Sequence, residues 1–179
     1  MRPALLVIDM LKEFVHGRLR SPGAERIVPV IKVLIEEFSR GKYPVIYLAD
    51  HHLPFDNELR IWGSHAMAGD QEAEIIEELR PPAGAIVLYK RSYSGFRDTG
   101  LDYVLRDLGV DTVVLTGIHT HICVLHTAID AFYSRYKLIV IEDAVAAFDE
   151  EAHTWGLKHM REILGAQVVS SSEFLRLLS

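Results

Sequence analysis

Six short apolar runs alternate along the chain with longer stretches of helical periodicity, and this alternation constrains the fold more than any other feature. The runs are nearly continuous in Val, Ile and Leu, which is typical of parallel strands that helices cover on both faces. Strands that alternate with helices predict right-handed βαβ units. We therefore expect an α/β fold with a doubly wound, mainly parallel six-stranded sheet. The predicted strands are Ala4–Ile8, Pro44–Ala49, Ala85–Lys90, Thr112–Thr116, Lys137–Ile141 and Gln167–Val169.

The stretches between these runs carry the helical pattern. Ile27–Phe38 places apolar residues at helical spacing and ends toward Gly41. The 179 residues contain no repeat and no low-complexity linker, and a chain of this length can bury a core of its own. We therefore expect a single domain over residues 1–179. Further helices are predicted over Glu72–Leu79, Leu101–Leu108, Cys123–Ser134 and Glu150–Leu164.

The composition narrows the classes of partner. Hydrophobic residues make up 49% of the chain and charged residues 25%, as in an ordinary globular protein. The 19 basic and 25 acidic residues give a net charge of −6 without a basic cluster, so we expect no nucleic-acid partner. No apolar run approaches the roughly 20 residues that span a bilayer, and the N-terminal segment is too short and too soon acidic for a signal peptide. We expect a cytoplasmic protein with a small-molecule substrate, and homo-oligomerisation stays open.

The chain has a single cysteine, Cys123, which excludes an internal disulfide and a multi-cysteine metal site. A predicted strand ends at Thr116, and the next helix is predicted to start at or near Cys123. A helix N-terminus favours a thiolate over a thiol, and its free N–H groups can hold an oxyanion. A lone cysteine is more often a small buried hydrophobic residue. This segment alone leaves both interpretations open.

Two charged residues stand at equivalent positions, each at the end of a predicted strand. Asp9 ends the first strand and Lys90 the third. Taken singly, an acidic residue that ends a strand and a solvated lysine are both ordinary. In open α/β sheets, however, ligands bind outside the carboxyl ends of the strands. A carboxylate, an ammonium and the Cys123 thiol on one rim can take a proton from sulfur and stabilise the resulting charges.

A long connection, Asp50–Asp70, is rich in His, Asp and Pro. A loop of about 20 residues inside a compact domain is uncommon and usually functional. Asp50 and His52, one residue apart, point the same way from an extended segment, and Glu58 and His65 follow within the loop. Mixed carboxylate and imidazole ligands suit Zn, Mn or Fe rather than Ca or Mg. The sequence predicts a divalent metal site here, with a plain polar surface loop as the alternative.

The segments around these residues resemble a known family, the isochorismatase-like cysteine hydrolases, and within it the nicotinamidases and pyrazinamidases. The similarity covers nearly the whole chain and is most specific around Cys123. It implies an isochorismatase-like, Rossmann-like fold. Its anchors are Val7–Asp9 with Phe14, Lys90–Phe96 with Thr99, Ile122–Ala131, Ala144–Phe148 and Gly165–Gln167.

The resemblance implies a role for each member of the trio. By this similarity Asp9 is the general base, Lys90 orients the pair and stabilises its charges, and Cys123 is the nucleophile. The family also has a cis peptide four residues before the cysteine, which here falls between Ile118 and His119. It would turn the N–H of His119, together with that of Cys123, toward the developing oxyanion.

The resemblance also implies what the long connection binds. Nicotinamidases carry Asp-x-His and a later His, some with a Glu seven residues before it, and Asp50, His52, Glu58 and His65 match this pattern; His51 is not an expected ligand. The pyridine nitrogen binds at the metal, here Zn with Mn or Fe as alternatives, so that the carboxamide faces the thiolate. Isochorismatase and carbamoylsarcosine amidohydrolase relatives are similar at the cysteine but lack this cluster. An aromatic wall is expected to sandwich the ring, although most aromatic residues only pack in a core. The expected wall residues are Phe14, Trp62 and Tyr93.

The expected reaction is hydrolysis of nicotinamide to nicotinate and ammonia through a cysteine thioester, as a step in recycling the pyridine of NAD, with pyrazinamide also accepted. Two alternatives stay open: an isochorismatase-like hydrolase of another small amide or ureide, and a non-enzymatic binding module or thiol sensor. Two residues beside the oxyanion turn depart from the family pattern and bear on substrate preference. His121 stands where an acidic residue is usual, and His119 is larger than the small residue often found there.

Overall fold

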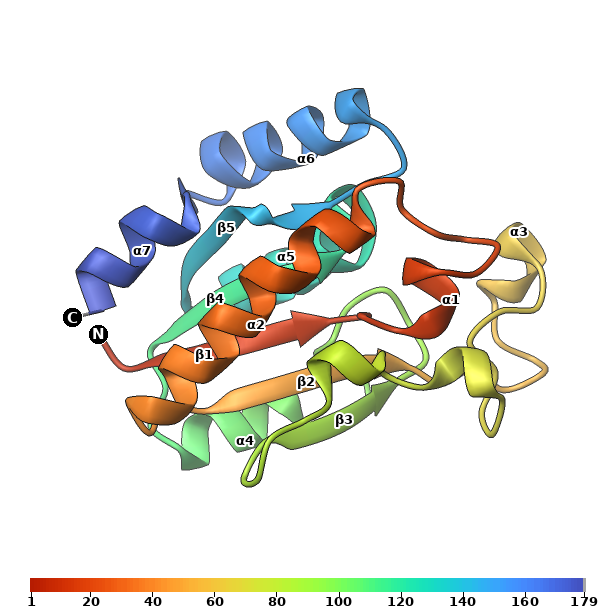
Figure 1. The fold of residues 1–179 in the computed structure, drawn as a ribbon, viewed down its shortest axis with the longest axis horizontal. Coiled ribbons are helices and arrows are strands. Elements are labelled where there is room, and N and C mark those ends of the chain that lie inside the picture. The colour runs from red at the N-terminus through yellow and green to blue at the C-terminus, as the bar shows by residue number, and fades with distance from the viewer. Residues whose placement is uncertain (179) are drawn as a thin grey trace.

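A computed structural model of the chain, in which residues 1–178 are described, contains a six-stranded parallel sheet in the order β3-β2-β1-β4-β5-β6 (Figure 1). This order confirms the predicted doubly wound α/β fold. The winding reverses between β1 and β4, and sheets of this kind bind ligands at the carboxyl ends of the strands near such a reversal. The strands are β1 (Pro3–Ile8), β2 (Val45–Asp50), β3 (Ile86–Lys90), β4 (Thr112–Ile118), β5 (Lys137–Ala146) and β6 (Gln167–Val169).

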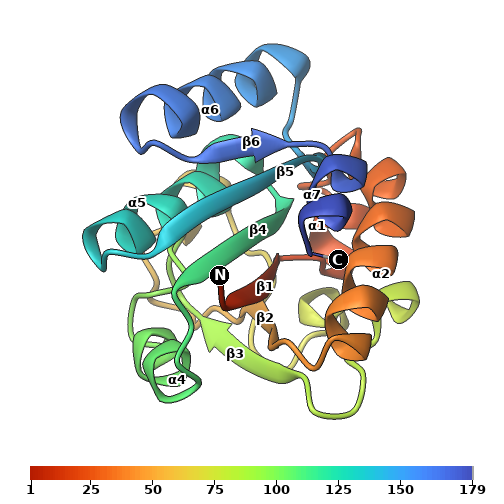
Figure 2. The same ribbon diagram turned by 90° about the vertical axis from the view of Figure 1, so that its left-hand side faces the viewer.

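Helices cover both faces of the sheet. Helices α2 and α7 lie on one face, and α4, α5 and α6 lie on the other (Figure 2). Successive residues of a strand point to opposite faces. Leu5 and Val7 of β1 accordingly pack in the core beneath α2, whereas Leu6 and Ile8 pack in the core beneath α5. The helices are α1 (Lys12–Val15), α2 (Ala24–Arg40), α3 (Leu59–Trp62), α4 (Leu101–Asp107), α5 (Leu125–Tyr133), α6 (Glu150–Ile163) and α7 (Ser171–Leu178).

The prediction of a helix over Glu72–Leu79 is wrong. Two short 3-10 turns, Gln71–Ala73 and Glu77–Leu79, lie there instead. The backbone between them forms hydrogen bonds with Met10 and Lys12. Because those bonds use the groups that a continuous helix would need, the local apolar pattern is overridden by the neighbouring chain.

Four further elements differ from the prediction, two of them the short helices α1 and α3, which were not predicted. Strand β5 continues past the predicted end at Ile141, and its pairing with β4 resumes after a bulge. The prediction stopped too early because the exposed Glu142 and Asp143 interrupt the apolar pattern of the strand. Helix α7 was not predicted. It contributes Phe174 to the core beneath α2, and a single buried aromatic side chain in eight residues is a weak periodic signal.

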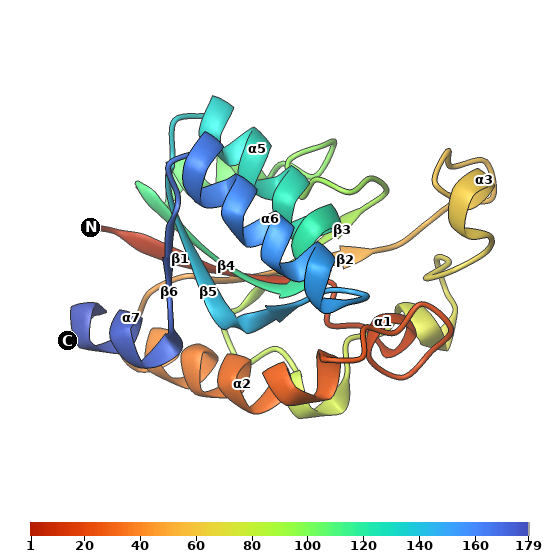
Figure 3. The same ribbon diagram turned by 90° about the horizontal axis from the view of Figure 1, so that it is seen from above.

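Strands β1 and β2 point toward α1 and α3 with their carboxyl ends (Figure 3), and the other strands run parallel to them. Asp50 and Lys90 are paired neighbours at the ends of β2 and β3. The connection from β2 to β3 and the turn after β4 leave the sheet at this same end. Among the described residues, no helix combines the length and the apolar character needed to cross a membrane.

Candidate active site

Four ionisable side chains meet at the carboxyl ends of the strands. The ammonium of Lys90 lies 2.8 Å from Asp9 Oδ2, 2.5 Å from Asp50 Oδ1 and 3.5 Å from Cys123 Sγ. Each of these residues is at most 5% exposed. The structure therefore brings together the predicted trio of Asp9, Lys90 and Cys123. It also makes Asp50, a predicted metal ligand, a second counter-ion of the lysine.

Asp9 is held in place through both its backbone and its side chain. Its φ of 52° turns the chain immediately after β1. Its backbone N–H donates to the Leu48 carbonyl at 2.8 Å, and its Oδ1 accepts the Asp50 N–H at 2.9 Å. Because these groups are buried, rotating the carboxylate away from Lys90 would leave a donor unpaired.

The turn that carries the cysteine begins at a glycine. Gly117 has a φ of 108°, and a Cβ at this position would lie 2.0 Å from the carbonyl oxygen of Ile8. Strand β4 can therefore approach β1 this closely only where there is no side chain. The next peptide bond but one, between Ile118 and His119, is cis, as the resemblance implied.

The helix predicted over Cys123–Ser134 begins earlier and in a different form. Thr120–Val124 is a π turn that runs directly into α5. The Val124 N–H donates to the His119 carbonyl at 3.2 Å, which closes the wide turn. Cys123 thus lies within this first turn, at the N-terminal end of a continuous helical segment, and not at its first residue.

Burial and charge set the resting protonation of the site. Burial raises the pKa of the Cys123 thiol well above its ordinary value, and Lys90 offsets only part of this. Burial, together with the charge of Asp50, raises the pKa of Asp9 to about 6. Burial acts to lower the pKa of Lys90, but Asp50 and Asp9 raise it well above its ordinary value. At neutral pH the site therefore holds a thiol, an ionised Asp9 and an ammonium, so burial outweighs the thiolate stabilisation expected from a helix N-terminus.

The four predicted metal ligands also come together. One ligand atom from each of Asp50, His52, Glu58 and His65 lies within 4.8 Å of the others, and all four residues are buried. His52 Nε2 lies 3.4 Å from Asp50 Oδ2 and 3.6 Å from Glu58 Oε2 and has no hydrogen-bond partner among the described residues. Burial and the nearby Asp50 raise the pKa of Glu58 to about 7. Closely spaced carboxylates with an unpaired imidazole nitrogen are what a divalent cation would satisfy.

The neighbours of the two histidines fix which nitrogen faces the cluster. His65 Nδ1 donates to the Gly63 carbonyl at 2.8 Å, and His52 Nδ1 lies 3.1 Å from Asp56 Oδ2. A proton on each Nδ1 leaves Nε2 with the lone pair that a metal needs. Arg91 Nη2 donates to Asp56 at 2.6 Å and keeps that carboxylate in place. These residues therefore fit a divalent transition metal, and Asp56 is a supporting residue that sequence reasoning missed.

His51, between the first two ligands, faces elsewhere. Its ring packs against Tyr89 at a centroid distance of 4.4 Å, and its Nε2 accepts the Gly69 N–H at 3.3 Å. This side chain is accordingly outside the cluster. An Asp four residues after a ligand histidine, as Asp56 is after His52, was the signal for a supporting carboxylate, but it is a weak one in a loop so rich in acidic residues.

A narrow cavity joins the metal cluster to the nucleophile. Cys123 lines it together with three of the four cluster residues. Its volume of about 20 Å³ is room for about one water molecule, so a substrate with a ring must displace part of the wall. The indole N–H of Trp62 donates to the Tyr93 hydroxyl at 2.9 Å. All three aromatic residues predicted to hold the ring line this cavity: Phe14, Trp62 and Tyr93.

Four further wall residues complete the cavity, and of their side chains only that of His119 was given a bearing on substrate preference by the sequence. Phe148 stacks on His119, with ring centroids 4.0 Å apart, and Trp62 packs against Phe148 at 5.7 Å. Leu19 and Ile122 supply the remaining apolar surface. Apolar side chains in a sequence carry no signal that separates a cavity wall from a core.

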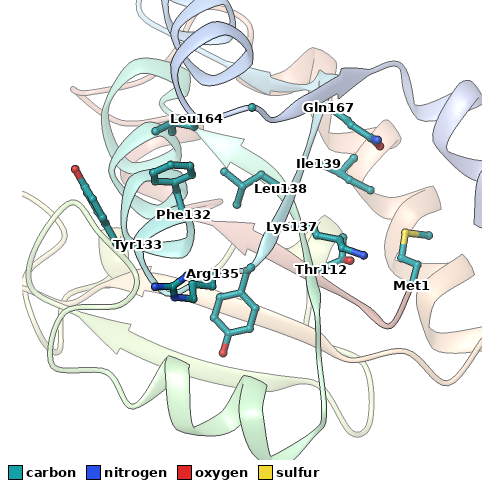
Figure 4. Close-up of a pocket in the computed structure, with 12 residues that line it drawn as sticks. Met1, Thr112, Phe132, Tyr133, Arg135, Lys137, Leu138, Ile139, Leu164 and Gln167 are labelled. Atoms are coloured by element: carbon teal, nitrogen blue, oxygen red, sulfur yellow. The ribbon is translucent and has the colours of Figure 1, made fainter.

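A much larger cavity lies at the opposite end of the sheet. It has a volume of about 750 Å³ and includes Thr112, Lys137 and Gln167, the first residues of β4, β5 and β6 (Figure 4). Tyr133, the last residue of α5, and Arg135, just after that helix, also border it. No carboxylate, thiol or imidazole is among the described residues that line it. The chemistry of the predicted residues therefore belongs to the narrow cavity.

Comparison with known proteins places this geometry in a family. Residues 3–173 match the isochorismatase domain. The structure of N-carbamoylsarcosine amidase from Thermoplasma acidophilum is 49% identical to this chain, with a TM-score of 0.90, over 96% of this chain and 97% of that one. Nicotinamidase from Bacillus subtilis is 31% identical, with a TM-score of 0.90, over 95% of this chain and 100% of that one. Pyrazinamidase of Pyrococcus horikoshii, solved in complex with zinc, is 28% identical, with a TM-score of 0.88, over 95% and 99%.

These matches extend over almost the whole chain and agree with the strand order and with the resemblance seen in the sequence. By both sequence and fold, this chain belongs to the isochorismatase family and is an isochorismatase-like hydrolase.

Proposed function

We propose that this chain is a metal-dependent amidohydrolase that converts nicotinamide to nicotinate and ammonia and also accepts pyrazinamide. One observation carries the proposal: the metal-ligand cluster and Cys123 open onto the same aromatic-lined cavity. A thiol nucleophile needs only a nearby base and a cation. A ligand cluster beside it is useful for a substrate that has a coordinating atom at a set distance from its amide. A pyridine carboxamide is such a substrate, and the similarity to nicotinamidases supports it.

The side chains of the site divide the chemistry between them. Asp9 takes the thiol proton of Cys123, since carboxylate oxygens of Asp9 and Asp50 and the Cys123 sulfur lie within 4.8 Å of one another. The thiolate attacks the carboxamide carbon, and the N–H groups of His119 and Cys123 receive the oxyanion. The C–N bond then breaks, and the proton on Asp9 passes to the leaving nitrogen as ammonia departs. The product of this half-reaction is a thioester on Cys123.

Hydrolysis of the thioester uses the same base. Asp9 removes a proton from a water molecule, whose oxygen attacks the thioester carbon. The C–S bond breaks, and the proton returns to the sulfur of Cys123, which restores the resting thiol and releases the acid. Lys90 remains charged throughout and stabilises whichever of its neighbours is anionic. Each catalytic group thus ends the cycle in its starting protonation state.

The metal ligands would be Asp50, His52, Glu58 and His65. A bound divalent metal, Zn with Mn or Fe as alternatives, would supply Lewis-acid coordination for a ring nitrogen. The aromatic side chains of Phe14, Trp62 and Tyr93 would hold the faces and edge of the ring. Because both ends of the substrate are then held, the amide carbon faces sulfur in a near-attack position. The reaction would return the pyridine of NAD to a form that can be reused.

A second candidate is hydrolysis of a carbamoyl compound by the same thiol chemistry. The observation that favours it is the 49% identity to the N-carbamoylsarcosine amidase of Thermoplasma acidophilum. The ligand cluster argues for the first candidate, because a ureide has no ring nitrogen to coordinate. A thiol sensor without enzyme activity would need neither Lys90 nor the cluster.

Ammonia release from a small panel separates these candidates. The protein is loaded with Zn, its metal content is measured on the same sample, and kcat/KM is determined for nicotinamide, pyrazinamide, benzamide and N-carbamoylsarcosine. We expect nicotinamide and pyrazinamide to be hydrolysed, and benzamide to be poorer by on the order of a hundredfold because it lacks the ring nitrogen. Benzamide that matches nicotinamide would show that the metal does not position the ring. N-carbamoylsarcosine as the best substrate would establish the second candidate.

A further inference from the structure

His119 lines the narrow cavity with a side chain to which the proposed reaction gives no role, since only its backbone N–H is used. The residue is 4% exposed, and its Nε2 has no hydrogen-bond partner among the described residues. Leaving a buried polar nitrogen unpaired is costly, and native interiors rarely do so without a reason. A substrate atom that reaches this nitrogen would recover the cost.

Neighbouring rings hold His119 where it is. It meets Phe14 edge to face at a centroid distance of 5.6 Å and an interplanar angle of 83°, and it stacks on Phe148 at 4.0 Å and 28°. A rotation that took the imidazole out of the cavity would break both contacts. The imidazole ring is therefore fixed within the aromatic wall, next to the place proposed for the substrate ring.

The surroundings favour an uncharged partner. Burial, aided by the nearby His121, lowers the pKa of His119 to about 3. A hydrogen bond with the backbone of Leu19 acts in the opposite direction and offsets only part of this shift. The imidazole is accordingly neutral at physiological pH. Phe14, Leu19 and Phe148 surround it, and no lysine or arginine is among the described residues that line the cavity. A carboxylate pointing toward this part of the wall would lose its hydration without gaining a counter-ion.

We propose that His119 is a specificity-determining residue whose imidazole forms a hydrogen bond with an uncharged polar atom on the substrate ring. Among the heteroaromatic amides that the site is proposed to hydrolyse, nicotinamide included, this contact would favour neutral ones with a second hydrogen-bonding ring atom or substituent, in addition to the nitrogen held at the cluster. Pyrazinamide, pyrimidine-5-carboxamide and 5-hydroxynicotinamide belong to this favoured class, whereas nicotinamide does not. This inference rests on the proposed function, because it requires a ring between the cluster and Cys123.

The test compares substrates within each variant, so that any general loss of activity cancels. For the Zn-loaded protein, kcat/KM is measured for pyrazinamide, pyrimidine-5-carboxamide and 5-hydroxynicotinamide, each divided by the value for nicotinamide. In His119→Phe we expect at least one of these ratios to fall about tenfold from its wild-type value. His119→Gln, which keeps an amide near Nε2, should restore part of it, whereas His119→Asn, whose amide lies near Nδ1, should not. His16→Phe is the matched control, because it makes the same change at an exposed histidine that does not line the cavity, so its ratios should stay within twofold of wild type.

A second measurement distinguishes substrate recognition by the His119 side chain from a disturbance of the oxyanion turn. In a Cys123→Ala background, the Kd ratios for the same amides should change on adding His119→Phe by the factor seen in kcat/KM. Ratios that are unchanged by His119→Phe in both measurements would overturn the inference and leave the proposed function intact. Failure of the wild-type protein to hydrolyse any pyridine or pyrazine amide would instead remove the proposed function, and the inference with it.

Discussion

The two sides of the narrow cavity are built in different ways. On one side, Asp50 lines the cavity and stands with Asp9 and Lys90 at the ends of adjacent strands, where ionic contacts of 2.5 and 2.8 Å join the three residues. On the other side, the wall comes from connections between elements: Leu19 precedes α2 and Phe148 precedes α6. The groups that would move protons are therefore fixed by the sheet, whereas the surface that would receive the substrate is carried by the connections between strands, including the short helices α1 and α3.

The contacts that hold the wall are more exposed to solvent than those of the ionic side. Arg18 donates from Nη2 to the carbonyls of Trp62 at 2.6 Å and Ser64 at 3.3 Å, at an exposed position. These bonds tie the connection after α1 to the end of α3. A wall held by exposed hydrogen bonds can open for a substrate at little cost, while a buried charge cluster cannot rearrange without leaving an ion unpaired. We expect changes on the ionic side to abolish chemistry or folding, and changes in the wall to alter substrate binding.

The largest effect is expected at the nucleophile. Cys123→Ala removes the atom that would form the thioester, so kcat/KM should fall at least ~10⁴-fold. The lost side chain is small, so the thermal unfolding midpoint and the Zn content should stay close to wild type. Ammonia release, a melting curve and elemental analysis on one preparation check this. Residual activity within tenfold of wild type would contradict a covalent mechanism.

Lys90→Met tests whether the ionic side also holds the fold together. Asp9 and Asp50 would keep their buried carboxylates without a cation, which should reduce the free energy of unfolding by about 3–5 kcal/mol. The matched control is Arg97→Met, which breaks an exposed pair with Asp130 and should cost no more than about 1 kcal/mol. Urea unfolding of both variants gives the comparison. Equal losses for the two would show that the buried cluster does not contribute in this way.

Asp56→Asn tests the support of the metal cluster. The substitution removes the carboxylate that favours a proton on His52 Nδ1 and leaves the ligands themselves unchanged. We therefore expect Zn affinity to fall by about 10–100-fold. Competition with a chelator of known affinity measures this. Asp70→Asn, an exposed change in the same connection, should leave the affinity as it is. Unaltered Zn binding in Asp56→Asn would exclude the proposed role of this carboxylate.

The pH profile reports on Asp9. Its pKa is raised to about 6, and the base must be ionised to take the thiol proton. As pH falls below about 6, kcat/KM should therefore drop tenfold per unit, and above it the base no longer limits the rate. A cation on Asp50 removes part of the repulsion that raises this pKa, so the midpoint of the metal-loaded protein should lie at or below that value. A profile that is flat down to pH 4 would rule out Asp9 as the base.

The smallest effect is expected in the wall. Arg18→Ala removes the bonds to the Trp62 and Ser64 carbonyls, so KM for nicotinamide should change by roughly two- to tenfold while kcat stays near wild type. Arg20→Ala, an exposed change two residues away, is the control. Steady-state kinetics on both variants decide the point. A loss confined to kcat would mean that the wall takes part in chemistry, and the contrast between the two sides would not hold.

The fold was predictable wherever the signal was local. All six strands were found because a parallel strand buried on both faces must be a continuous apolar run, and such runs stand out in a sequence. The segment Glu72–Leu79 was misjudged because its bonding partners, Met10 and Lys12, come from a distant part of the chain. Helix α7 was missed because one buried Phe174 is too little periodic signal to show a helix.

The sequence by itself determined that Asp9, Lys90 and the turn bearing Cys123 share one edge of the molecule, because parallel strands send all their carboxyl ends the same way. It could not determine that Asp50 forms an ion pair with Lys90 as well as belonging to the metal-ligand cluster, or that Asp56 contacts Nδ1 of the ligand His52. Those contacts depend on how separate connections fold over the sheet. The protonation state of the thiol also depends on the tertiary structure. Burial is a property of everything packed around Cys123, and its effect on the pKa outweighs the local effect of the helix end.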